Sequence, residues 1–80
     1  MDDTEVLERI RRLVDEEHQL ETRHVGEALT ADEQARLRDL EVALDQCWDL
    51  LRQRRARRAS GRDPDEAEVR PGSVVEGYQQ

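Results

Sequence analysis

The sequence predicts an all-α protein built on an antiparallel two-helix hairpin that is coiled-coil-like. Three observations support this fold class. Apolar residues recur at alternating spacings of three and four in two segments, which is the seam pattern of packed helices. Neither segment has a Gly or Pro in its interior. The connection between them is about five residues long, and connections this short make neighbouring helices antiparallel.

The first segment predicts a helix over residues 4–25. Asp2 or Asp3 can cap its start, and Gly26 is placed to end it in a left-handed conformation. Glu17 interrupts the apolar seam, and polar residues at seam positions set register or partner choice at a cost in stability. The seam positions are Val6, Ile10, Leu13, Glu17, Leu20 and His24.

The second segment predicts a longer helix over residues 31–59, after a turn over 26–30. Thr30 and Glu33 have the spacing of a capping box, in which each side chain satisfies a free backbone N–H of the first turn. When the chain folds back in this turn, the apolar positions of both helices fall in register, so residues 1–59 form one hairpin. The second seam is Leu37, Leu40, Leu44, Cys47 and Leu51.

The apolar arc of this hairpin is wider than a two-helix seam requires. Leu7, Val14 and Trp48 lie on one flank of the seam, whereas Ala43 and Leu50 lie on the other. A second hairpin can cover these flanks, so we expect a homodimer that forms a four-helix bundle. The residues predicted for self-association are Leu7, Val14, Trp48 and Leu50.

Residues 60–80 form an acidic tail that contains Pro and Gly and has no periodicity. Such a composition is compatible with disorder. The alternative is a tail that docks on the hairpin through Val74, Val75 and Tyr78.

The chain has 20 acidic and 13 basic residues and a formal net charge of −7, which argues against general affinity for nucleic acids or anionic membranes. It has no apolar run long enough for a signal peptide or a membrane span, and its single cysteine, Cys47, fits a reducing compartment. We therefore expect a cytoplasmic protein. No motif of a catalytic or cofactor site is present, so neither an enzyme nor a cofactor is expected.

Six arginines cluster near the end of the second helix. Guanidinium groups suit phosphate, but cations are also favoured at any helix C-terminus, and the hairpin places Arg54 level with Asp3. No aromatic residue is interleaved for base stacking, so nucleic acid is not the expected ligand. The candidate surface for an unknown protein partner is instead Arg54, Arg55, Arg57, Arg58 and Tyr78.

Glu21 and His24 form a Glu-x-x-His pair, with Glu17 one turn earlier on the same side. Pairs of this kind build metal sites in four-helix bundles. A metal-binding bundle that uses Glu17, Glu21 and His24 from two chains is therefore an alternative function.

The stretches EEHQLETRH, LRDLEVALDQCWDLLRQRRARR and DPDEAEVRPGSVVEGYQQ together resemble an actinobacterial family of short proteins, DUF2630, whose function is unknown. The block DQCWDLLR and the closing VEGY are the most specific parts of the resemblance. It implies an actinobacterial source and a complete chain, but no mechanism.

The expected function is a non-catalytic protein–protein interaction module, because charged helical hairpins are generic binding elements. Besides metal binding, a further alternative is a hairpin that acts on RNA polymerase through an acidic tip formed by Glu27, Asp32 and Glu33.

Overall fold

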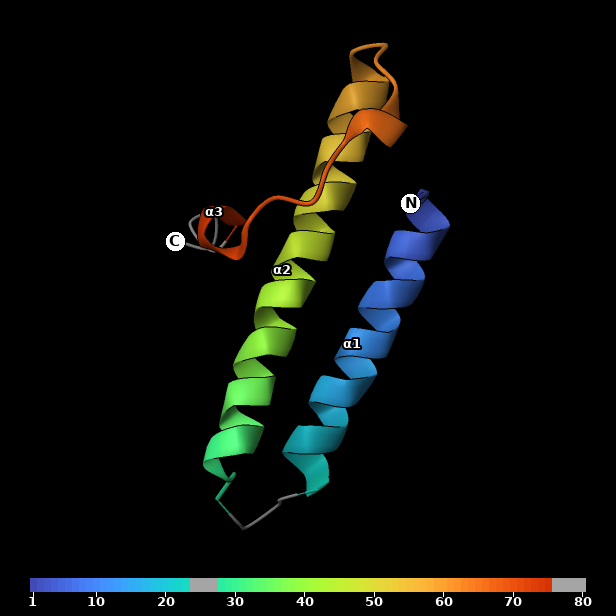
Figure 1. The fold of residues 1–80 in the computed structure, drawn as a ribbon. Helices are drawn as coiled ribbons and strands as arrows, with labels where there is room; N and C mark the ends of the chain where they lie inside the picture. Colours follow the sequence, from blue (N-terminus) through green and yellow to red (C-terminus); the bar gives the residue numbers. More distant parts are fainter. Residues whose placement is uncertain (24–27, 76–80) are drawn as a thin grey trace.

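The computed structural model describes residues 1–23 and 28–75, and these residues contain helices but no strand. Its two long helices, α1 (Asp3–Arg23) and α2 (Ala31–Ala59), lie side by side and run in opposite directions (Figure 1). A 3₁₀ turn, η1 (Pro64–Glu66), and a short helix, α3 (Gly72–Val75), follow. The molecule is elongated, with extents of 50 × 24 × 17 Å. The predicted all-α class is confirmed.

Helix α1 begins one residue earlier than predicted because Asp2 caps it. The backbone N–H of Glu5 donates to Asp2 Oδ1 at 2.8 Å, which satisfies one of the free donors of the first turn. Asp3 therefore does not cap the helix, and its carboxylate forms ion pairs with Arg54 and Arg58. The predicted stop at Gly26 lies outside the described residues.

Helix α2 has a defined signal at each end. At its start, the N–H of Glu33 donates to Thr30 Oγ1 at 3.1 Å, and the N–H of Thr30 donates to Glu33 Oε1 at 2.9 Å, which completes the capping box. At its end, Gly61 has a φ of 76°, and the N–H of Arg62 donates to Arg57 O at 2.7 Å. This Schellman motif reverses the chain, and glycine is the residue that adopts the required left-handed conformation most easily.

The two seams meet as the heptad pattern predicts. The buried seam residues are Val6 and Ile10 from α1 and Leu40, Cys47 and Leu51 from α2. Leu13 and Leu44 pack against this core and stay partly exposed. Arg36 donates from Nε to Glu16 Oε2 at 2.5 Å, which links the helices on the outside of the seam.

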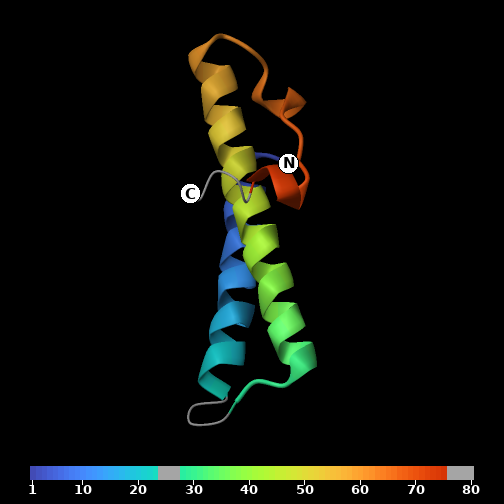
Figure 2. The same cartoon turned by 90° about the vertical axis from the view of Figure 1, so that its left-hand side faces the viewer.

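The described part of the tail is docked and not extended into solvent. After Gly61 it returns along α2, and α3 lies on the side of α2 that faces away from α1 (Figures 1 and 2). Val75 is 1% exposed, as the docking alternative expected, whereas Val74 is 44% exposed. The third predicted contact, Tyr78, lies outside the described residues.

Candidate interaction surface

One flank of the hairpin remains open, and we call it the open face; it consists of Leu7, Val14 and Trp48. Leu7 and Val14 are 44% exposed and Trp48 is 43% exposed, although all three are large apolar side chains. Leu7 and Val14 are seven residues apart, so they lie on the same side of α1. Exposed apolar patches of this kind mark interaction sites in soluble proteins.

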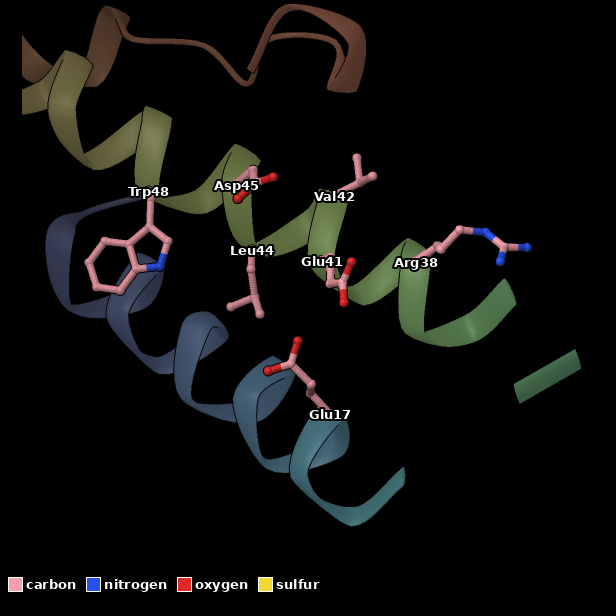
Figure 3. A pocket seen from close by; sticks show the side chains of 7 residues that line it. All are labelled: Glu17, Arg38, Glu41, Val42, Leu44, Asp45 and Trp48. Atoms are coloured by element: carbon pink, nitrogen blue, oxygen red, sulfur yellow. The ribbon is translucent and has the colours of Figure 1, made fainter. Parts of the chain in front are cut away.

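A groove of about 600 Å³ borders this face between the two helices. In Figure 3, Trp48 and Leu44 point from α2 toward α1, and Glu17 rises from α1 toward Leu44 and Glu41. Partial burial raises the pKa of Glu17, and the negative charges of Glu21 and Glu41 raise it further. The groove is thus apolar at its Trp48 end, and toward the turn of the hairpin it is lined by Glu17 and Glu41 together with Arg38.

The opposite flank is closed by the tail, and this corrects the prediction for Leu50. Leu50 is 6% exposed and belongs to the same buried cluster as Val6 and Leu51, against which Ala67 of the tail packs. It therefore offers no free surface for self-association. The pattern of α2 alone could not show this, because the segment that covers Leu50 has no periodicity of its own.

An ion pair between a buried carboxylate of α2 and a partly exposed arginine holds the tail on α2. Asp49 is fully buried, and the guanidinium of Arg70 donates to both of its carboxylate oxygens, with Nε 2.9 Å from Oδ2. Gln53 Nε2 donates to the same Oδ2 at 2.9 Å and to the backbone oxygen of Glu68 at 2.8 Å. Gln46 Nε2 donates to the backbone oxygen of Arg70 at 3.2 Å. The hydrogen bond from Arg70 is the main cause that lowers the pKa of Asp49.

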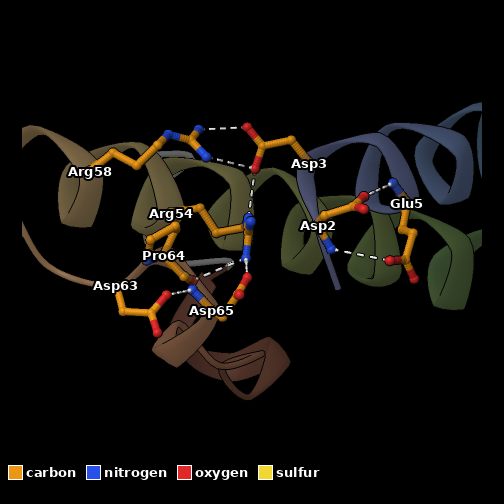
Figure 4. A network of polar contacts seen from close by, with 8 residues as sticks. All are labelled: Asp2, Asp3, Glu5, Arg54, Arg58, Asp63, Pro64 and Asp65. Carbon is orange, nitrogen blue, oxygen red and sulfur yellow. Dashed lines mark hydrogen bonds and ion pairs between the residues drawn. The ribbon is translucent and has the colours of Figure 1, made fainter.

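Arg54 is not a surface residue, so its assignment to the partner surface is wrong. It is 4% exposed, and its Nε donates to Asp3 Oδ1 at 2.6 Å (Figure 4). Its Nη1 donates to the backbone oxygen of Pro64 at 3.1 Å and to Asp65 Oδ1 at 3.0 Å. One side chain thereby joins the start of α1, the end of α2 and η1.

The other predicted partner residues differ in their contacts. Arg58 Nη2 lies 2.5 Å from Asp3 Oδ2, and Arg57 Nη1 lies 3.5 Å from Glu66 Oε2, so both arginines form intramolecular ion pairs. Arg55 is exposed and forms no ion pair with any residue in the described part of the chain. Tyr78 is not described.

The predicted metal site needs residues from two chains and His24, so it stays a prediction. Glu17 is half-buried and Glu21 is exposed, while His24 lies outside the described residues. Within residues 1–23 and 28–75, no three His, Cys, Asp or Glu side chains are grouped closely enough to hold a metal ion. The thiol of Cys47 is buried, which raises its pKa and makes it a poor nucleophile.

The chain matches one protein family over nearly its whole length. The model of the family described as "Protein of unknown function (DUF2630)" matches residues 2–80. The chain belongs to the DUF2630 family. The DUF2630 relatives include uncharacterized proteins of Mycobacterium tuberculosis (Rv0898c) and Mycobacterium bovis (Mb0922c). Each is 56% identical over 78 residues, which cover 95% of this chain and 88% of the relative.

No solved structure matches this DUF2630 chain significantly. None of the helices in its described residues is long and apolar enough to cross a membrane.

Sequence reasoning missed the residues that fix the tail. The residues three and four positions from Asp49, which share its side of the helix, are polar, so the pattern does not mark Asp49 as buried. Arg70 stands in a segment without periodicity. One signal was present, because Asp49 is followed four residues later by Gln53 on the same side of the helix. That spacing shows which helix surface is polar, but not that a basic residue of the tail lies over it.

Proposed function

We propose that this DUF2630 protein is a non-catalytic protein–protein interaction module that self-associates through its open face. The observation that carries the proposal is the exposure of Trp48 beside Leu7 and Val14 in a chain whose other apolar flank is covered. Tryptophan is enriched among the residues that contribute most to binding free energy at interfaces. An interface here removes three large apolar side chains from water.

The docked tail supports this assignment because it leaves one flank for association. The tail covers Leu50, and the Asp49–Arg70 pair holds it there. The open face is then the flank that we assign to the second molecule of a four-helix arrangement. The outer surface, where Arg57 and Arg58 form ion pairs with Glu66 and Asp3, is the surface that we assign to a different partner protein.

Sedimentation equilibrium over about 1–300 µM tests self-association. The natural chain should form a dimer whose dissociation constant is in the micromolar range, and Trp48→Ala should weaken it by roughly 100-fold, because each dimer loses two anchors. Val69→Ala is the matched control, since Val69 is 59% exposed but lies on the tail. A natural chain that stays monomeric throughout this range contradicts the proposal, as does equal weakening by both substitutions.

Binding of a second protein is tested by affinity capture from the cytosol followed by titration of the purified components. A captured protein supports the module only if the purified chain binds it stoichiometrically. The control is a variant with Arg57→Ala and Arg58→Ala. If this variant captures as much of the partner protein as the natural chain does, the partner binds another surface.

Two alternative functions gain no support from the described residues. Within one chain, the described residues hold no metal-ligand group, and the predicted ligand His24 lies outside them. At the tip of the hairpin, the carboxylate of Glu33 accepts the N–H of Thr30 and so serves the cap of α2. Helix capping therefore accounts for Glu33 without any contact to RNA polymerase, and Glu27 of the predicted tip lies outside the described residues.

A further inference from the structure

We infer that the molecule on the open face is a second copy of this chain in the antiparallel orientation, with a twofold axis that passes beside Trp48 at right angles to α2. The inference rests on the proposed self-association and adds its geometry. It follows from the order of charges along α2 on either side of Trp48.

Opposite charges flank Trp48 at equal distances. Glu41 precedes Trp48 by seven residues and Arg55 follows it by seven. Seven residues are two helical turns, or about 10.5 Å, so the three side chains lie along one side of α2. Glu41 and Arg55 are exposed, and neither forms an ion pair with another residue of the described ranges 1–23 and 28–75.

A twofold axis at Trp48 makes this arrangement self-complementary. Rotation about an axis perpendicular to α2 reverses the direction of the helix, so Glu41 lies opposite Arg55 of the partner subunit. The same contact occurs a second time on the other side of the axis, because a twofold interface is isologous. Two opposite-charge pairs therefore flank the two tryptophans.

The apolar residues of α1 fit inside these charge pairs. The Arg54–Asp3 ion pair fixes the register of the hairpin and places Trp48 level with residue 9 of α1. Leu7 then lies about 3 Å from the level of the axis on one side, and Val14 about 7.5 Å on the other. The apolar centre and the charged pairs about 10.5 Å away reproduce the core and rim of protein interfaces.

The other twofold arrangement brings like charges together. If the axis runs parallel to the helices, both hairpins point the same way and their turn ends coincide. Glu17, Glu21 and Glu41 of one chain then lie near the same carboxylates of the partner, and Arg38 offsets only one of these charges in each chain. Glu17 already lies in a negative environment within one chain, and charge repulsion across an interface selects against such an orientation.

Charge reversal distinguishes the two arrangements. In the antiparallel dimer, Glu41→Arg and Arg55→Glu each turn two attractive pairs into two repulsive ones, so each should raise the dissociation constant about tenfold or more at low salt. The double variant should return to within about threefold of the natural chain. An equimolar mixture of the two single variants should form a heterodimer, since all its pairs are attractive. In the parallel dimer, Glu41→Arg relieves repulsion and tightens association, which would overturn the inference.

A distance measurement gives an independent readout. Ala59 is eleven residues from Trp48, so spin labels on Ala59→Cys in a Cys47→Ala background should lie about 33 Å apart across the antiparallel dimer. Labels in the parallel dimer come within about 20 Å, because α2 helices on the diagonal of one bundle are close. Circular dichroism of every variant checks that the helices remain folded.

The failures of the two proposals are distinct. A natural chain that never dimerises removes the proposed function itself. A dimer that is tightened by Glu41→Arg, or that gives the short label distance, leaves the proposed function intact and overturns only the antiparallel geometry.

Discussion

Neighbouring arginines of α2 have different roles because they point to different sides of the helix. Arg54 is 4% exposed and donates to Asp3, Pro64 and Asp65, whereas Arg55 is exposed. A buried guanidinium is tolerated only when its donors are satisfied. Of these two neighbouring arginines, Arg54 therefore has the structural role and Arg55 does not.

Arg54→Ala should lower the free energy of unfolding by about 2 kcal/mol, because three hydrogen bonds and the packing of the buried side chain are lost. Arg55→Ala is the adjacent control and should change it by less than about 0.5 kcal/mol in the monomer. Urea denaturation at low protein concentration measures both. Equal effects of the two substitutions would contradict the structural role of Arg54.

Helix α2 has a different environment on each of three sides. One side carries the seam with α1, a second holds the tail, and a third carries Trp48 of the open face. The contact with the tail is close at α3, where a Cβ on Gly72 would lie 2.6 Å from Cγ1 of Val42. Glycine at this position lets the tail approach α2.

Gly72→Ala should destabilise the docked tail by about 1–3 kcal/mol, because the added methyl group overlaps Val42. Hydrogen exchange at Val75, whose N–H donates to Pro71 O at 3.3 Å, should become faster, while amides in α1 should change less. Adding Val42→Ala removes the overlapping atom and should restore protection. If protection in the double variant is no better than in Gly72→Ala, the close approach is not the cause.

At the scale of the whole molecule, one carboxylate links the start of α1 to the end of α2 at the open end of the hairpin. Asp3 at the start of α1 accepts from Arg54 and Arg58 at the end of α2, and Arg54 continues the link to η1 (Figure 4). The hydrogen bond from Arg58, followed by that from Arg54, lowers the pKa of Asp3 from 3.8 to about 2. Stability is therefore coupled to the charge of Asp3.

The sign of this coupling predicts acid sensitivity. A carboxylate with a lowered pKa in the folded state stabilises the fold fully above its ordinary value of 3.8 and loses this effect as the pH falls toward about 2. Asp3→Asn should therefore lower the urea midpoint at neutral pH and flatten its decline between about pH 4 and 2. Asp15→Asn, an exposed carboxylate of the same helix, is the control. A decline that is as steep in Asp3→Asn as in the natural chain would show that Asp3 does not contribute. Asp49 and Glu16, whose pKa values are also lowered, contribute to the remaining slope.

The sequence by itself determined those features of the helices that are encoded by residues close together in the chain. The alternation of three and four fixed which sides of α1 and α2 meet, and the Thr30–Glu33 spacing fixed the start of α2, because these signals act within one or two turns. The exposed position of Leu7, Val14 and Trp48 on one flank also follows from this periodicity. Their self-association stays a prediction.

Only the tertiary structure decided what the tail covers. Its main contact joins Asp49 to Arg70, 21 residues further along the chain, and no local pattern encodes a pairing of that kind. The docked tail turned Leu50 from a surface residue into a core residue, and η1 completed the burial of Arg54. Local spacing specifies which face a side chain occupies, whereas the path of a non-periodic segment specifies whether that face meets protein or water.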